Sequence, residues 1–342
     1  MAGDPVEAGT LVPAEFWRAQ DDPSFPVLAR GGRRPVVAIV ALSGYAADPL
    51  EPVRADAQLR AQGCEVRHYD DPQARHQRFA APDAVRLAGL HAAADDPEVD
   101  VIIALRGGYG ISRLLPDIDF TKLVASKKLL VGHSDFTALQ MGLLCHGGAS
   151  FAGPTVCSDF AFENVSATTM RDFWRCLTGP THCVRLAEVD TQGVNVKGIL
   201  WGGNLAMLAH LVGSSWMPAI EDGILFLEDI NEHPFRIERM LLQLLHAGIL
   251  EKQAAVVLGD FSGGRTATYD NGYDFEAMLA FIRSRTSVPI VRGLPFGHMR
   301  GKVTLAVGSR ASLRCDAQES VLTMSDYPLL CDLRSQSLST CG

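Results

Sequence analysis

The chain has 342 residues, of which 47% are hydrophobic and 20% are charged, and its formal net charge is -8. This composition is typical of a globular protein with room for two domains, and it excludes the disordered and fibrous classes. The acidic balance and the absence of any run of Lys or Arg argue against a nucleic-acid-binding protein, so an anionic small substrate would need locally placed arginines.

Eight cysteines are scattered without a CxxC pair or a matching histidine cluster, so neither a metal site nor a disulfide framework is predicted. Free thiols in a reducing cytosol fit this pattern best. Residues 1–34 contain no basic segment followed by an apolar one, so no export signal is predicted. The early apolar run at residues 36–42 is too short to cross a membrane. We therefore expect a cytoplasmic protein with no membrane partner.

After residue 34, strand and helix patterns alternate. Strands are predicted at residues 36–42, 65–69, 101–105 and 129–131, and helices at residues 49–61, 82–94 and 120–125 and after Ser134. Such alternation predicts an α/β fold with a doubly wound parallel sheet, in which ligands bind beyond the carboxyl ends of the strands.

The second half of the chain has a different pattern. Residues 167–188 mix aromatic, polar and Gly-Pro signals and are interpreted as a linker. Strand-like runs then outnumber helices, at residues 198–201, 223–228, 255–258, 303–307 and 311–314. We predict an N-terminal extension (1–34), an α/β domain (35–166), a linker (167–188) and a smaller, sheet-rich α+β C-terminal domain (189–342).

The stretch from Leu130 to Thr137 places Ser134 between an apolar strand and a helical pattern. A serine on such a tight strand-to-helix turn projects its hydroxyl above the sheet, as a nucleophile does. The following helix N-terminus directs free N–H groups and a positive dipole end at the same place. Taken alone, the stretch fits a serine that caps the helix better than it fits a nucleophile. Two later stretches favour the nucleophile instead.

Residues Arg106-Gly107-Gly108-Tyr109-Gly110 form a glycine-rich turn at the end of a predicted strand, on the same sheet edge as Ser134. Such a turn lets backbone N–H groups approach a negative charge, as in an oxyanion hole. The GxGxxG dinucleotide pattern is absent, because Arg113 stands where its last glycine would be, and no Lys-Ser/Thr pair follows as in a P-loop. The alternative is a plain tight turn.

Glu228 follows the apolar run 223–227 and His298 lies in a loop before the run 303–307. Acids after a strand are commonly helix caps, and a lone loop histidine is usually solvated. Together with Ser134, however, they supply nucleophile, orienting acid and base in the chain order Ser, acid, His, which α/β-hydrolases also use.

Five motifs in this order resemble the LD-carboxypeptidases, the muramoyl-tetrapeptide carboxypeptidases of serine peptidase family S66. They are Arg106 to Gly110, Gly132 to Leu139, Trp201-Gly202-Gly203-Asn204-Leu205, Leu227 to Arg236, and Gly297-His298. The resemblance runs from about residue 36 to residue 307, and the extension and the tail from about residue 325 lie outside it.

The resemblance implies a Ser-Glu-His triad of Ser134, Glu228 and His298. It implies an oxyanion hole of backbone N–H groups from Asp135 and from Gly108 or Gly107. It also implies a flavodoxin-like N-terminal domain with a smaller C-terminal domain, a homodimer, and no cofactor. Candidate substrate contacts are Tyr109, Asn204 and Arg106.

These implications predict a serine carboxypeptidase that releases D-Ala from murein tetrapeptides during cell-wall recycling. Two alternatives stay open. Some relatives cleave acylated nucleotide antibiotics, and a non-catalytic protein could use the glycine turn as an anion site. The sequence leaves open which of Arg106, Arg113, Arg236 and Arg239 meets the substrate's carboxylates. After His298, the stretch Met299 to Lys302 and the run Thr304-Leu305-Ala306-Val307-Gly308 depart from the family pattern, which usually has Thr-Leu-Pro-Leu-Gly there.

Overall fold

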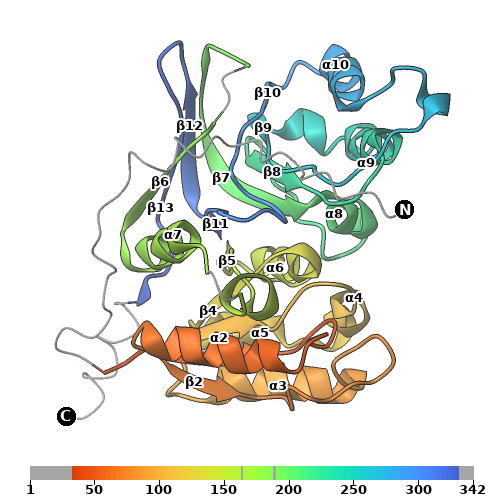
Figure 1. Cartoon of the computed structure of the whole chain (residues 1–342). Coiled ribbons are helices and arrows are strands. Elements are labelled where there is room, and N and C mark those ends of the chain that lie inside the picture. The colour runs from red at the N-terminus through yellow and green to blue at the C-terminus, as the bar shows by residue number, and fades with distance from the viewer. Residues whose placement is uncertain (1–32, 163–164, 188–189, 331–342) are drawn as a thin grey trace.

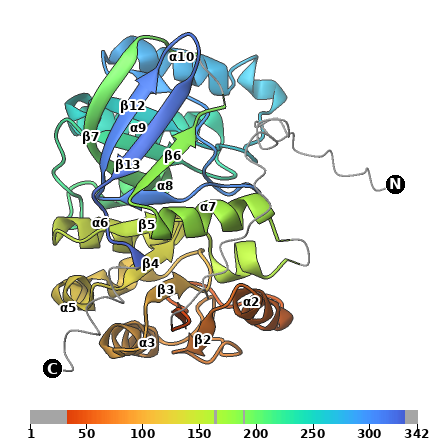
Figure 2. The same ribbon diagram turned by 90° about the vertical axis from the view of Figure 1, so that its left-hand side faces the viewer.

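The computed structural model describes residues 33–162, 165–187 and 190–330. Two β-sheets form two halves of the molecule, one built mainly from the first part of the chain and the other from the second (Figure 1). Helix α6 lies between the two halves, as the view turned by 90° also shows (Figure 2). Within the described residues, no helix combines the length and apolar composition needed to cross a membrane.

The first sheet has six strands in the order β11-β5-β4-β3-β1-β2, all parallel except β11. They are β1 (Val36–Val40), β2 (Glu65–His68), β3 (Val101–Ala104), β4 (Leu129–Gly132), β5 (Ser150–Ala152) and β11 (Leu305–Val307). Its helices are α2 (Leu50–Ala61), α3 (Asp83–Asp95), α4 (Ile111–Leu114), α5 (Phe120–Ser126) and α6 (Thr137–Cys145). The order β2-β1-β3-β4-β5 is that of a flavodoxin-like sheet, and the predicted α/β class is confirmed.

The central strands are buried along their whole length. In β1 and β3 every residue is buried, because helices cover both faces of a parallel sheet. Continuous apolar runs such as Val36–Val40 are the sequence signature of this arrangement. Helix α6 is buried on all sides over residues 137–143, which include the polar Thr137 and Gln140, because it lies between the two sheets.

The second sheet has seven strands in the order β10-β9-β8-β7-β12-β13-β6. Strands β7 to β10 pair in parallel, and β7, β12, β13 and β6 pair antiparallel. The strands are β6 (Thr181–Arg185), β7 (Val194–Asn204), β8 (Ile224–Glu228), β9 (Ala255–Leu258), β10 (Ile290–Val291), β12 (Arg310–Cys315) and β13 (Ser320–Ser325). Helices α8 (Leu205–Leu211), α9 (Pro234–His246) and α10 (Phe275–Arg285) accompany them. A second, sheet-rich half was predicted, and the mixed sheet agrees with it.

Two segments differ from their expected places. The segment 167–188, interpreted as a linker, contains helix α7 (Ala167–Thr178) and strand β6, which pairs with β13 in the second sheet. Phe173 and Trp174 in α7 are fully buried, so this helix contributes to the core. Strand β11, expected in the C-terminal domain, pairs with β5 in the first sheet. The domain boundaries themselves stay a prediction, and residues 1–32 of the extension lie outside the described residues.

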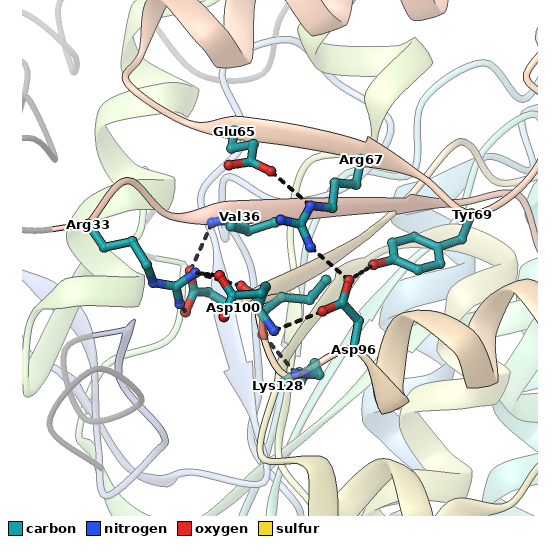
Figure 3. A network of polar contacts seen from close by, with 10 residues as sticks. Arg33, Val36, Glu65, Arg67, Tyr69, Asp96, Asp100 and Lys128 are labelled. Carbon is teal, nitrogen blue, oxygen red and sulfur yellow. Dashed lines mark hydrogen bonds and ion pairs between the residues drawn. The ribbon is translucent and has the colours of Figure 1, made fainter. Parts of the chain in front are cut away.

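A polar network lies at the amino ends of the strands of the first sheet (Figure 3). Asp100, which directly precedes β3 and is 2% exposed, accepts hydrogen bonds from the Val36 N–H at 2.8 Å and from Arg33 at 2.8 Å. Lys128, just before β4, donates to the carbonyl of Val99 at 2.8 Å. This network fixes where the strands begin, on the edge opposite Ser134 and the glycine turn.

Nearby, Arg67 extends the network to two further acids. It bonds Glu65 at 2.8 Å and Asp96 at 2.8 Å, and Asp96 also accepts from the Tyr69 hydroxyl (Figure 3). Burial and the hydrogen bond to Asp96 raise the pKa of Tyr69 to about 12. Strand β2, the edge strand of the sheet, is thereby tied to the end of α3.

We predict that Asp100→Ala lowers the free energy of unfolding by roughly 2–4 kcal/mol, because it leaves a buried N–H unpaired and removes a charged acceptor. The measurement is urea denaturation followed by circular dichroism. Glu98→Ala is the matched control, since Glu98 pairs with the same Arg33 at 3.5 Å but is 57% exposed, and it should cost less than about 0.5 kcal/mol. Equal losses in the two variants would contradict the role given to Asp100.

Candidate active site

Ser134 lies between the end of β4 and the start of α6, in a short 3-10 turn (Ser134–Phe136). Its backbone φ is 65°, a left-handed conformation that costs a non-glycine residue about 1–3 kcal/mol. Buried helix α6 and the sheet on either side hold it there. The predicted strand-to-helix turn is thus present, with a strained serine at its apex.

The glycine turn packs directly against this serine. A Cβ atom on Gly107 would lie 2.8 Å from the Cβ of Ser134 and 2.9 Å from its Oγ, so only glycine allows the two turns to approach this closely. Gly108 has a φ of 119°, a conformation that side chains rarely adopt. The backbone N–H of Gly108 therefore belongs to a turn that borders Ser134, as an oxyanion donor would require.

Asp135 joins the two turns through its side chain. Its Oδ2 atom accepts hydrogen bonds from Ser43 Oγ at 2.6 Å and from the Ile111 N–H at 3.0 Å, and the residue is 1% exposed. Burial raises the pKa of the Asp135 carboxyl, although these two hydrogen bonds act in the opposite direction. The carboxyl group thus fixes the glycine turn relative to the backbone that follows Ser134.

His298 and Glu228 form a hydrogen-bonded pair. The imidazole Nδ1 lies 2.8 Å from Glu228 Oε2, and Glu228, at the end of β8, is fully buried. A carboxylate only accepts, so Nδ1 carries the proton and Nε2 is left with a free lone pair. Burial acts to lower the pKa of His298, but the hydrogen bond and the charge of Glu228 outweigh it and the pKa is raised.

Asn204 braces the acid of this pair. Its Nδ2 atom donates to Glu228 Oε1 at 3.2 Å and to Asp229 Oδ1 at 3.1 Å, while its Oδ1 caps helix α8 through the Met207 N–H at 3.1 Å. Both amide hydrogens are used within the site, so any contact of Asn204 with substrate would have to use Oδ1. Burial, and then the nearby charge of Glu228, raise the pKa of Asp229 to about 6 despite its hydrogen bonds.

The two halves of the molecule meet at this place. The backbone N–H of Asn204, at the end of β7, donates to Thr137 Oγ1 at 3.0 Å, and a Cβ on Gly203 would lie 2.5 Å from that same oxygen. The ring of His298 contacts the ring of His133, the residue before Ser134, edge-on with centroids 5.2 Å apart. Ser134 thus comes from the first sheet, and Glu228 and His298 from the second half.

Ser134 Oγ itself has no hydrogen-bond partner within the described part of the chain. In proteins without substrate, the hydrogen bond between a nucleophile and its base is often long, and it tightens in the substrate complex. The structure brings His298 next to the Ser134 turn, and the hydrogen bond between them belongs to the proposal below.

Three arginines near the glycine turn contact two tyrosines. Arg106 donates to the carbonyl of Tyr45 at 3.1 Å, and Arg75 lies 4.8 Å above the Tyr45 ring. Arg78 lies 5.5 Å from the ring of Tyr109, which is 42% exposed. No motif singled out Arg75 or Arg78, whose segment is placed by the Gly44–Phe79 bridge. Both follow β2, so they lie at the same sheet edge as Ser134.

The other arginines named from the sequence have partners. Arg113 pairs with Asp83 at 2.7 Å, and Arg236 pairs with Glu232 at 2.5 Å. Arg239 lies 5.4 Å from the ring of Phe235. Arg106 is therefore the one of the four that directly borders the glycine turn. Among the described residues, no cluster of three or more His, Cys, Asp or Glu side chains is arranged to hold a metal ion.

Comparison with known proteins identifies the family. Residues 37–153 match the LD-carboxypeptidase N-terminal domain, and residues 197–313 match the LD-carboxypeptidase C-terminal domain. The murein tetrapeptide carboxypeptidase of Pseudomonas aeruginosa is 31% identical over 77% of this chain and 87% of its own length. The chain belongs to the LD-carboxypeptidase family, peptidase family S66.

Two further relatives of this LD-carboxypeptidase family member differ in how similar they are to it. The crystal structure of muramoyltetrapeptide carboxypeptidase from Oxalobacter formigenes has a TM-score of 0.83 and 52% sequence identity, and the match covers 86% of this chain and 99% of that one. The microcin C7 self-immunity protein MccF of Escherichia coli is 26% identical over 67% of this chain and 75% of its own length. The chain is thus similar to murein peptide carboxypeptidases and, at lower identity, to a self-immunity protein.

We predict that Gly107→Ala lowers the kcat/KM of the carboxypeptidase reaction about a hundredfold or more, because the added methyl displaces Ser134, and misplacement by about 1 Å is enough for such a loss. The measurement is steady-state hydrolysis of a murein tetrapeptide. Gly44→Ala is the control, since a Cβ there meets its neighbours at 3.5 Å, an ordinary contact distance. Similar kcat/KM values for Gly107→Ala and the parent would show that the two turns need not touch.

Proposed function

We propose that the protein is a serine LD-carboxypeptidase that releases the terminal D-Ala from murein tetrapeptides, L-Ala-γ-D-Glu-meso-diaminopimelate-D-Ala, in peptidoglycan recycling. The observation that carries the proposal is the hydrogen-bonded pair of His298 and Glu228 beside the strained Ser134 turn. The murein tetrapeptide carboxypeptidases among the relatives support the substrate class.

In the proposed mechanism, His298 Nε2 takes the proton of Ser134 as the serine oxygen attacks the carbonyl between diaminopimelate and D-Ala. Glu228 holds the imidazole by accepting from Nδ1–H and stabilises the imidazolium that forms. The backbone N–H groups of Asp135 and Gly108 bind the oxyanion. His298 then protonates the leaving amine of D-Ala, and water hydrolyses the acyl-enzyme.

Substrate recognition would use the cations around the glycine turn. We assign Arg106 and Tyr109 to contacts with the peptide, and Asn204 Oδ1 to a backbone N–H of it. Arg75 and Arg78 extend the same positive rim, and the structure describes no carboxylate within ion-pair distance of either. In a chain of net charge -8, such a local group of arginines is the expected device for an anionic peptide. A homodimer and a cytoplasmic location belong to the same proposal.

Ser134→Ala should abolish turnover while substrate binding and the fold stay nearly unchanged, since alanine removes one oxygen and no core volume. Loss of one member of a triad that acts as a unit costs on the order of 10^4-fold or more in kcat. The measurement is tetrapeptide hydrolysis together with calorimetric titration of the same peptide. Activity close to that of the parent would refute the serine mechanism.

Amidation of the tetrapeptide's terminal carboxylate should lower kcat/KM roughly ten- to a hundredfold, because charge-assisted hydrogen bonds worth about 1.5–3 kcal/mol are lost. A pentapeptide ending in D-Ala-D-Ala should be cut poorly, since its last bond joins two D centres. Both are measured by mass spectrometry of the released amino acid. Equal rates for amide and acid, or for D-D and L-D ends, would contradict the LD-carboxypeptidase proposal.

The same assay separates the alternatives. Preferential hydrolysis of an aminoacyl-sulfamoyl nucleotide over the tetrapeptide would favour an activity like that of MccF, which has been crystallised with glutamyl sulfamoyl guanosine. Failure of a fluorophosphonate probe to label Ser134 would favour a non-catalytic binding protein.

A further inference from the structure

A buried cation lies in the loop that carries His298. Lys302 is 2% exposed, and its Nζ atom pairs with Asp159 at 2.9 Å. Asp159, in the short π-helix Val156–Phe160, is 8% exposed and also accepts from the Thr155 N–H at 2.8 Å. Removing two charges from water costs several kcal/mol per ion, and apolar residues of similar size often stabilise a fold better. Stability alone is therefore a weak reason for this pair.

Lys302 also contacts the residue next to the candidate nucleophile. Its Nζ atom lies 3.4 Å from Nε2 of His133, whose other ring nitrogen, Nδ1, lies 2.8 Å from the carbonyl of Gly153. Burial, and then the charges of Lys302 and His298, lower the pKa of His133 well below its usual value, so its ring is neutral. A carbonyl only accepts, so Nδ1 carries the proton and Nε2 accepts from Lys302.

These contacts connect the two halves of the site. Lys302 and His298 belong to one loop, and His133 and Ser134 are consecutive residues of the turn after β4. The His133 ring also lies edge-on to the rings of His298, at 5.2 Å, and Phe296, at 6.4 Å. His133 thus joins the turn to the loop through one hydrogen bond, to Lys302, and two ring contacts, to His298 and Phe296.

We propose that Lys302 is a positioning residue that, through His133 and Asp159, holds the Ser134 turn in register with the loop that presents His298. The inference rests on the proposed function, because the role given to Lys302 is to position Ser134 and His298 relative to one another. His133 lies within the motif Gly132 to Leu139 and Lys302 ends the stretch Met299 to Lys302, but neither residue was assigned a role from the sequence.

Lys302 also acts electrostatically on the proposed base, His298. The groups that face His298 are Glu228, Asp229 and Asp260, whose negative charges favour the imidazolium, and Lys302, whose positive charge disfavours it, together with neutral His133. A general base must be unprotonated to act. Without the positive charge of Lys302, the carboxylates would raise the pKa of His298 further. The acid limb, which is the fall in rate on the acid side of the pH profile where His298 becomes protonated, should therefore move to higher pH.

The test is the pH dependence of inactivation by a fluorophosphonate, which reacts at an activated serine whatever the peptide specificity. The variants are Lys302→Met, Lys302→Arg and the double variant Lys302→Met/Asp159→Asn, which removes both charges while leaving residue 159 able to accept from Thr155. Lys128→Met is the matched control, because Lys128 is also a buried lysine but lies at the opposite edge of the first sheet (Figure 3). Thermal melting of each variant reports its folding.

We expect both Met variants to lose about tenfold or more in the plateau inactivation rate. The acid limb of Lys302→Met should move up on the order of half a pH unit. Lys302→Arg should keep the parent's limb, and Lys128→Met should alter melting without moving it. A folded double variant with the parent's plateau and limb would overturn the inference, as would failure of both Met variants to fold, since the pair would then be a folding element. A parent protein that does not react at Ser134 would overturn the proposed function instead.

Discussion

The left-handed backbone of Ser134 is the constraint on which the candidate site depends. Such a conformation persists only where the surroundings over-determine it. Here β4 fixes one side of the turn, and helix α6, whose residues 137–143 are all buried, fixes the other. Gly107 then presses its backbone against the serine, and Asp135 ties the glycine turn to the same backbone. The packing of these elements around Ser134 thus holds its backbone in the strained conformation.

The base and its orienting acid reach this turn from a separate sheet. Strand β8 delivers Glu228 at its carboxyl end, and Asn204 at the end of the neighbouring strand β7 pairs with it. The same asparagine residue contacts Thr137 at the start of α6 through its backbone. Asn204 therefore takes part both in orienting the acid and in the contact between the two halves, which links the placement of the sheets to the geometry of the site.

Much of this arrangement could be predicted because it is local. Strands buried on both faces are continuous apolar runs, as in Val36–Val40. Ser134 stands two residues after the end of one such strand, β4, and Glu228 is the last residue of another, β8. The rest depends on distant contacts. Strand β6 alternates exposed and buried residues, so it has no continuous apolar run, and it pairs with β13 far along the chain; the segment 167–188 was therefore interpreted as a linker. Lys302 and His133 are 169 positions apart, and no local pattern encodes their meeting. A substrate contact of Asn204 stays a prediction, but the bonds of its amide hydrogens to Glu228 and Asp229 join residues 24 and 25 positions apart, and no local pattern predicted them.

Strand β11 has a consequence for how the chain is made. It pairs with β5, although α7 and five of the seven strands of the second sheet lie between them in sequence. During synthesis, the backbone groups on the side of β5 that faces away from β4 stay unpaired until residue 307 has left the ribosome, so the first half cannot complete its sheet before most of the second half exists. An open edge of this kind is a template for association with other chains. Two growing molecules that exchange this strand would form a swapped dimer, and chaperones that shield sheet edges would favour the correct product.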